Sequence, residues 1–131
     1  MAQMTRSKSA TGTRSRLIEA GLDIFGESGN SGATTRMIAD RGEANLAAIP
    51  YHFGGKEGLY VAVIDHIVTT VREQLDPILI EIEAHVAQGM LQPDDAQKLL
   101  EKFLGRLVDF VVGSQEAPRF SRIILREQMS P

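Results

Sequence analysis

The sequence predicts an all-α fold, and three features of the 131-residue chain support this prediction. Apolar residues recur at helical spacing in several segments, and Gly or Pro residues separate one segment from the next. No alternation typical of a strand continues for more than a few residues. We therefore expect a bundle of three helices, followed by a long connecting helix and part of a further helical domain.

Capping and turn residues set the limits of the first three helices. Ser, Thr, Asp and Asn side chains accept hydrogen bonds from free N–H groups at helix starts, and Gly commonly ends a helix. The predicted order is one helix, a second short helix, a tight turn and a third short helix. The residues that mark them are Leu17, Phe25 and the segment 26–32, then Thr34 and Gly42, then Asn45, Leu46, Ala48 and Gly54.

Residues 59–131 are predicted to form longer helices. An apolar stripe follows Glu57, and the pair Asp76-Pro77 either starts a new helix or kinks the existing one. Gly89 breaks the pattern, Pro93 starts another helix, and a last helix covers roughly residues 119–129. The positions expected to face inward in the helix after Pro93 are Leu99, Leu100, Phe103, Leu104, Leu107 and Val111.

The residues present exclude several kinds of chemistry. Disulfides and thiolate metal sites are excluded because the chain has no Cys, and its three His residues do not group with other zinc ligands. Gly55-Lys56 does not complete the phosphate-binding pattern GxxxxGK[ST], because Pro50 stands at the first glycine position and Glu57 follows the lysine. We therefore expect no enzyme, no metal and no cofactor.

Neither a membrane segment nor a secretion signal is predicted. No apolar run approaches the roughly 20 residues that cross a bilayer. The first 16 residues are polar and lack the apolar core of a signal peptide. We therefore expect a cytoplasmic protein without a membrane partner.

The net charge of −3 taken alone argues against nucleic acid as a partner, but the charge is unevenly distributed. Residues 1–58 carry seven basic and six acidic side chains, whereas residues 59–131 carry seven basic and eleven acidic ones. Four of the basic side chains lie in residues 1–16, although Met1–Gly12 taken alone is typical of a disordered, solvated arm. The first half can therefore present a local basic patch to an anionic partner.

Two short helices joined by a tight turn are typical of a helix-turn-helix, whose second helix enters the major groove of DNA. The groove is about 12 Å wide and admits a helix of about 10 Å diameter, so small residues on the leading face favour close approach. Leu46-Ala47-Ala48 meets this need, and such apolar groups can also contact thymine methyls.

Groups suited to phosphate surround this helix. Thr34 and Thr35 lie at a helix N-terminus, where free N–H groups favour an anion, and Arg36 can reach a phosphate or a guanine edge. Tyr51 and His52 offer hydrogen-bond donors, and Lys56 adds a cation. The predicted DNA-binding residues are Thr34, Thr35, Arg36, Asn45, Leu46, Ala47, Ala48, Pro50, Tyr51, His52 and Lys56.

Four groups of residues carry a resemblance to a known family. They are Leu17-Ile18-Glu19-Ala20-Gly21 with Ile24-Phe25, Ala33-Thr34-Thr35-Arg36 with Ile38-Ala39, Ala48-Ile49-Pro50-Tyr51-His52-Phe53, and Lys56-Glu57-Gly58-Leu59-Tyr60. In this order they resemble the DNA-binding domain of the TetR family of bacterial transcriptional regulators, over the stretch from Thr13 to Val63.

Two residues depart from the family pattern. Glu43 stands where the family usually places Gly in the turn, so either Glu43 adopts a left-handed conformation or the turn shifts its register. Pro50 replaces a common aromatic phosphate contact, and within a helix it would remove one N–H donor and crowd the carbonyl of Leu46.

The resemblance implies a DNA-binding domain in residues 13–58, followed in residues 59–131 by the connecting helix and a truncated regulatory and dimerisation domain. It implies a homodimer on a pseudo-palindromic operator, more often a repressor than an activator, released by a small-molecule effector. The effector pocket would lie among the later helices and the dimer interface on two C-terminal helices, with much of both beyond Pro131. The residues alone also allow an all-α protein-interaction module without DNA binding, which would use the apolar stripe between Leu99 and Val111.

Overall fold

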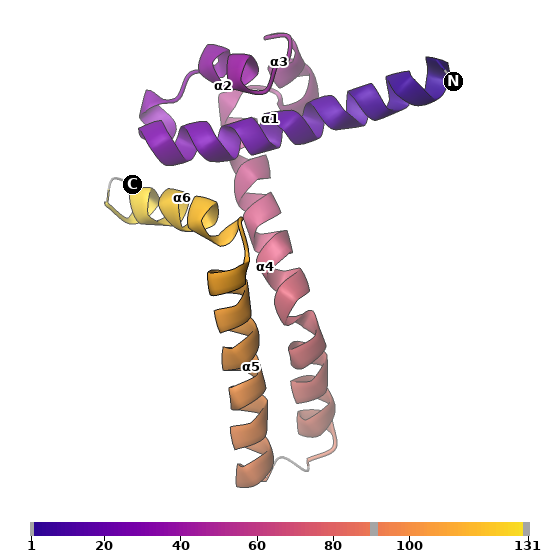
Figure 1. The fold of residues 1–131 in the computed structure, drawn as a ribbon, viewed down its shortest axis with the longest axis vertical. Helices are drawn as coiled ribbons and strands as arrows, with labels where there is room; N and C mark the ends of the chain where they lie inside the picture. The colour runs from indigo at the N-terminus through magenta and orange to yellow at the C-terminus, as the bar shows by residue number, and fades with distance from the viewer. Residues whose placement is uncertain (1, 90–91, 130–131) are drawn as a thin grey trace. The chain divides into compact units, whose positions relative to one another are not determined.

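The computed structural model describes residues 2–89 and 92–129 (Figure 1). These residues form helices without any strand, which confirms the predicted all-α fold. The helices are α1 (Ala2–Gly32), α2 (Thr35–Arg41), α3 (Ala48–Phe53), α4 (Lys56–Ala87), α5 (Pro93–Gly113) and α6 (Ala117–Met129). Contacts divide the chain into two compact units, one of Met1–His66 with Arg119–Pro131 and one of Ile67–Pro118.

The beginning of α1 differs from the expectation. The backbone is helical from Ala2 onward, so the disordered arm predicted for Met1–Gly12 is wrong for residues 2–12. The end of α1 lies within the predicted glycine segment, because Gly29 has a non-helical φ of 74° and Gly32 is the last residue. Residues with a Cβ rarely adopt such a positive φ, which explains why a glycine lies at this break.

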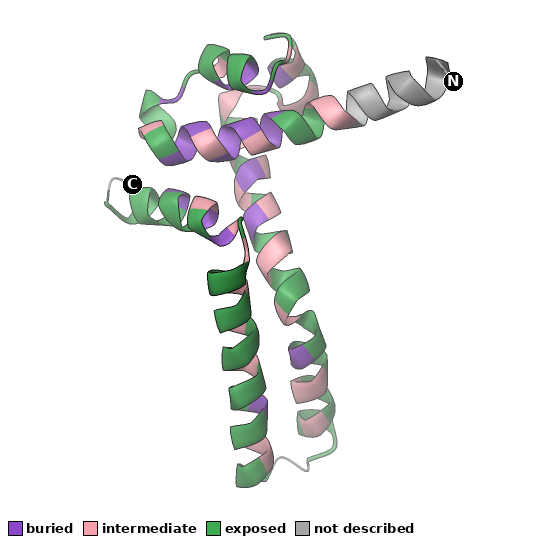
Figure 2. Ribbon diagram, viewed as in Figure 1, coloured by how far each residue is buried: buried purple, intermediate pink, exposed green. Residues whose placement is uncertain are grey.

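The core of the first unit joins all of its helices (Figure 2). Helix α1 contacts α2 and α3, and these two short helices contact each other. The ring of Phe25 in α1 meets the ring of Tyr60 in α4 edge-on, with centroids 4.9 Å apart. The side chains that are at most 3% exposed here include Leu17, Leu22, Phe25, Ile38, Ile49, Leu59, Val63, Phe120 and Ile123. The unit therefore holds α2 and α3 on a closed apolar core.

The turn from α3 to α4 depends on glycines. Gly54 and Gly55 have φ values of 82° and 152°, in the region that favours glycine. At Gly58, in the first turn of α4, any Cβ would collide with the backbone carbonyl of Phe53 at the end of α3. The absence of a side chain at Gly58 therefore permits the close approach of α3 and α4.

The second unit contains the rest of α4 and α5. Helix α4 continues through Pro77 to Ala87, so no new helix starts there, and the predicted break follows at Gly89 with a φ of 65°. Helix α5 begins at Pro93 as predicted. None of the described helices is long and apolar enough to cross a membrane.

The predicted inward face of α5 is only partly correct. Leu99 is buried, and Phe103 and Leu107 are half-buried. The other three predicted positions are solvent-exposed, at 57% for Leu100, 48% for Leu104 and 56% for Val111. The apolar stripe is wider than the surface that the rest of this unit covers. Among the residues of this unit that the structure describes, the buried apolar ones are Ile67, Ile78, Leu99 and Ala117.

Candidate nucleic-acid interface

Helix α2 begins and ends where its local signals predicted. The Thr34 hydroxyl accepts a hydrogen bond from the Met37 N–H at 3.1 Å, which makes Thr34 the N-cap. Gly42 is the C-cap, and its N–H donates to the Ile38 carbonyl at 2.9 Å. Ile38 is fully buried, whereas Arg36 is exposed. The inner face of α2 is thus fixed in the core while its first turn stays accessible.

The turn between α2 and α3 adopts the first of the two predicted alternatives. Glu43 has a φ of 53°, the left-handed conformation, and no shift of the turn's register is needed. The Ala44 N–H then donates to the Ala39 carbonyl at 2.9 Å. Arg16 of α1, which the sequence did not single out for this role, donates from Nε to the Gly42 carbonyl at 3.1 Å. Arg16 therefore ties the turn to α1.

Helix α3 starts later than predicted. Asn45 does not cap it: its side-chain oxygen accepts from the Ala47 N–H at 3.0 Å, and the N-cap position is Ala47, without a side-chain cap. Leu46 and Ala47 lie in the turn before the helix, and α3 runs from Ala48 to Phe53.

The late start removes the predicted conflict at Pro50. Pro50 is the third residue of α3, where an N–H would have no partner within the helix, so proline costs no hydrogen bond there. The carbonyl of Leu46 accepts from the Ile49 N–H at 3.3 Å, and the Tyr51 N–H donates to the Ala47 carbonyl at 3.2 Å. The helix is therefore tightened in its first turn and is not interrupted.

The eleven predicted DNA-binding residues all remain accessible. Tyr51 is 84% exposed and Leu46 is 41% exposed, whereas the intervening Ile49 is fully buried. The exposed members are Thr34, Arg36, Asn45, Leu46, Ala47, Pro50 and Tyr51, and the half-buried ones are Thr35, Ala48, His52 and Lys56. The first turn of α2, the segment before α3 and α3 itself thus offer these groups to a partner from a single unit.

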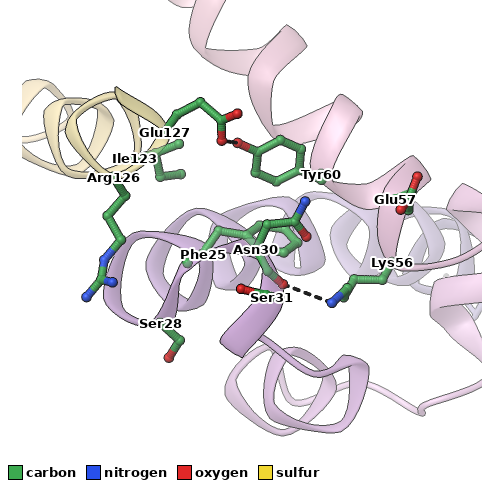
Figure 3. Close-up of a pocket in the computed structure, with 11 residues that line it drawn as sticks. Phe25, Ser28, Asn30, Ser31, Lys56, Glu57, Tyr60, Ile123, Arg126 and Glu127 are labelled. Atoms are coloured by element: carbon green, nitrogen blue, oxygen red, sulfur yellow. Dashed lines mark hydrogen bonds between the residues drawn. The ribbon is translucent and has the colours of Figure 1, made fainter. Parts of the chain in front are cut away.

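Lys56 has a structural contact that the sequence analysis missed. Its ammonium donates to the carbonyl of Asn30 at 2.8 Å (Figure 3). It also donates to the carbonyl of Ala33 at 3.1 Å, just after the end of α1. A lysine near a helix C-terminus satisfies carbonyls that lack partners within the helix. Because an ammonium has three N–H donors, one donor is left for a further acceptor.

A cleft of about 410 Å³ lies beside Lys56, between the end of α1, the start of α4 and α6 (Figure 3). On its wall, the Tyr60 hydroxyl donates to Glu127 Oε2 at 2.6 Å. Burial, together with the hydrogen bond to Glu127 and the charge of that carboxylate, raises the pKa of Tyr60 to about 12. Tyr60 thus connects α4 with α6 as a neutral hydrogen-bond donor.

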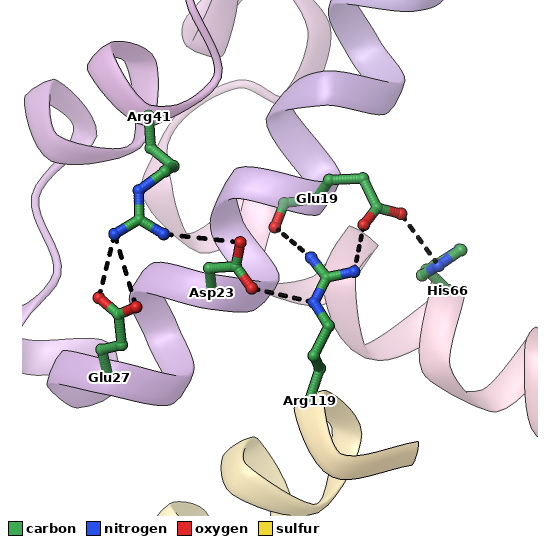
Figure 4. A network of polar contacts seen from close by, with 6 residues as sticks. All are labelled: Glu19, Asp23, Glu27, Arg41, His66 and Arg119. Atoms are coloured by element: carbon green, nitrogen blue, oxygen red, sulfur yellow. Dashed lines mark hydrogen bonds and ion pairs between the residues drawn. The ribbon is translucent and has the colours of Figure 1, made fainter. Parts of the chain in front are cut away.

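A network of ionic side chains joins α6, α1 and α2 (Figure 4). Arg119 of α6 donates to Asp23 Oδ1 at 2.9 Å and to Glu19 Oε2 at 2.6 Å. The other oxygen of Asp23 lies 3.6 Å from Arg41 of α2, which also bonds Glu27 at 3.3 Å. The three carboxylates recur every four residues along α1, at Glu19, Asp23 and Glu27. This spacing places them on one face of the helix, so the sequence could have indicated the network.

Arg119 is the centre of this network. Burial alone would lower its pKa, but hydrogen bonds to Glu19 and Asp23 and their negative charges outweigh that effect and raise it. Arg119 therefore ties α6 to α1 beside Asp23, the carboxylate that also pairs with Arg41 of α2.

The comparisons with known proteins agree with this geometry. Residues 17–63 match the family model "Bacterial regulatory proteins, tetR family". The chain is 38% identical over 120 residues to the HTH-type transcriptional dual regulator CecR of Shigella flexneri, a match that covers 90% of this chain and 52% of the relative. It is 26% identical over 124 residues to the HTH-type transcriptional repressor NicS of Pseudomonas putida, which covers 95% of this chain and 52% of that protein.

A third relative is the probable HTH-type transcriptional regulator YttP of Bacillus subtilis, 26% identical over 115 residues, with 88% of this chain and 50% of the relative covered. The chain thus spans about half the length of these relatives. The matched residues 17–63 contain the end of α1, all of α2 and α3, and the start of α4, which are the elements that form the accessible surface. Residues 17–63 are therefore a domain of the TetR family of bacterial regulatory proteins.

Proposed function

We propose that this chain is the DNA-binding part of a sequence-specific transcriptional regulator. The observation that carries the proposal is the helix-turn-helix of α2 and α3, whose eleven predicted contact residues are accessible while Ile38 and Ile49 anchor it in the core. As its matched relatives include a repressor and a dual regulator, we propose repression, in the cytoplasm, as the main mode of action.

In this proposal, residues 13–58 bind DNA, and residues 59–131 form the connecting helix and part of a regulatory and dimerisation domain. Phosphates would be bound by Thr34, Thr35 and the free donor of Lys56, which fix the register of the helix on the duplex. Base edges would be met by Arg36 and by the apolar groups of Leu46 and Ala47.

The operator is proposed to be a pseudo-palindrome bound by a homodimer. Recognition helices of a symmetric dimer must lie about 34–36 Å apart to enter successive major grooves. A small-molecule effector would release DNA by binding more tightly to a dimer with a different spacing, because a ligand shifts an equilibrium only by its differential affinity.

Selection of binding sites from random duplex DNA, performed with the full-length dimer, tests this proposal. We expect an enriched sequence with two inverted half-sites. Enrichment of a single, asymmetric half-site would contradict the symmetric dimer but keep the DNA-binding function. The absence of any enriched sequence would contradict sequence-specific regulation and would favour the protein-interaction module.

A further inference from the structure

The arginines of the first unit divide into two groups according to their partners. Most of those from Gly12 onward donate to acceptors within the fold. Arg16 bonds the Gly42 carbonyl, Arg41 bonds Asp23 and Glu27, Arg119 bonds Glu19 and Asp23, and Arg126 bonds the carbonyls of Gly26 and Glu27. These guanidinium groups hold helices together, so some of their N–H donors are already used within the fold.

Arg14 of α1 is different. Its side chain is exposed, and it has neither a hydrogen bond nor an ion pair with any residue whose side chain the structure describes. Its guanidinium carbon lies 5.1 Å from the ring centroid of Phe53, the last residue of α3. This position over an aromatic ring is a cation–π contact.

The contact orients Arg14 without using its donors. A guanidinium held over an aromatic ring by a cation–π contact uses none of its N–H groups in a hydrogen bond, so these donors can still bind a phosphate. Phe53 is half-buried and its ring lies 6.1 Å from that of His52, so the ring belongs to the aromatic end of α3. Arg14 is therefore placed beside the predicted recognition helix with its donors available.

We propose that Arg14 is an additional phosphate-binding residue of the DNA interface and that Phe53 positions it. The inference rests on the proposed DNA-binding function and adds to it a contact from α1 and a positioning role for a ring at the end of α3. Arg14 thereby supplies charge, whereas Phe53 reduces the conformational freedom that the guanidinium loses on binding.

The test measures the affinity of the protein for a labelled random-sequence duplex of about 30 base pairs, as a function of salt concentration. The variants are Arg14→Gln, Arg14→Lys and Phe53→Leu. Arg106→Gln is the matched control, since it removes the same charge from an exposed arginine of α5. Thermal unfolding of each variant shows whether the fold is retained.

Loss of one phosphate contact lowers the slope of log K against log salt by about 0.9 per chain. We expect this change for Arg14→Gln and an unchanged slope for Arg106→Gln. Arg14→Lys should keep the slope but bind several-fold more weakly, because lysine keeps the charge and loses the planar fork of N–H donors. Phe53→Leu should also weaken binding at an unchanged slope, and it should have little further effect in the Arg14→Gln background.

Two results would overturn the inference. The first is an Arg14→Gln protein with the slope and affinity of the unchanged protein. The second is additivity of Phe53→Leu and Arg14→Gln, since independent effects would mean that the ring does not position the arginine. Failure of the unchanged protein to bind the duplex at low salt would instead contradict the proposed function itself.

Discussion

Glu43 shows how a single residue can carry strain within an otherwise regular motif. It is exposed, and its φ of 53° is unfavourable for a residue with a Cβ. We predict that Glu43→Gly raises the free energy of unfolding by about 0.5–1 kcal/mol, because glycine adopts this conformation without steric cost. Denaturant unfolding measures the change. Glu43→Ala is the control, since it removes the same carboxylate but retains the Cβ and should give no such gain.

The ionisation of Tyr60 is a second property that belongs to one residue. The chain contains two tyrosines, so Tyr51→Phe leaves Tyr60 as the only one. We predict that ultraviolet titration of this variant gives a midpoint at a pH of about 12. A midpoint at about 10, the ordinary value for tyrosine, would contradict the contact with Glu127.

The pH dependence of stability follows from the direction of this shift. Because folding raises the pKa of Tyr60, its contribution to stability is complete below a pH of about 10 and is lost as the pH rises through about 12. Glu127→Gln removes the carboxylate charge and should lower the midpoint, although burial should keep it above the ordinary value.

At the scale of helices, Lys56 links the start of α4 to the end of α1. We predict that Lys56→Ala weakens binding to every duplex sequence and lowers the salt slope by about 0.9, because the remaining N–H donor of the ammonium is lost. The same substitution should speed amide hydrogen exchange around the turn from α1 to α2, where Asn30 and Ala33 lose their donor. Faster exchange with an unchanged slope would assign Lys56 to the fold alone.

Arg119 performs a similar role for α6. We predict that Arg119→Met lowers the free energy of unfolding by about 1–2 kcal/mol. The substitution removes the charged hydrogen bonds to Glu19 and Asp23, which are partly exposed to solvent. The Arg119 side chain is 29% exposed, and those of Glu19 and Asp23 are 44% and 32% exposed. Chemical denaturation measures this loss. Arg122→Met on the same helix is the matched control, and equal losses for both variants would contradict the role of the network.

Elements with local signals could be predicted from the sequence, and those set by distant contacts could not. Thr34 and Gly42 mark the ends of α2 through bonds to residues within four positions, so the predicted limits were correct. The Asn45 side chain can accept a hydrogen bond either as a helix N-cap or within a turn before the helix. The sequence alone does not distinguish between these two hydrogen bonds. The inward face of α5 was partly wrong because periodicity cannot say how much of an apolar stripe its neighbours cover.

In the candidate site, too, local features could be predicted from the sequence and distant contacts could not. The eleven predicted DNA-binding residues were named from motif and residue type. The structure shows that they are accessible, and their contact with DNA stays a prediction. The contacts of Arg14, Arg16 and Lys56 could not be predicted, because each reaches an acceptor or ring at least 23 positions away in the chain. Such pairs become visible only when the helices are placed in space.

For the whole chain, the two compact units differ in the size of their cores (Figure 2). Most of the buried apolar residues that the structure describes belong to the first unit, whereas four of them lie in the described part of Ile67–Pro118. We predict that native-state hydrogen exchange of this chain gives lower opening free energies for α5 than for α2 and the middle of α1, because α5 has few buried contacts. Equal protection throughout the described helices would contradict this order.

Part of the family resemblance has a further consequence for how relatives are interpreted. It concerns four residues at the start of α4, which are Lys56, Gly58, Leu59 and Tyr60. Lys56 bonds the end of α1, Gly58 admits the carbonyl of Phe53, Leu59 is fully buried and Tyr60 contacts Phe25. These positions are constrained by the closure of the bundle. Two proteins with the same residues at these four positions therefore share the packing of this domain. Their DNA operators can still differ in sequence.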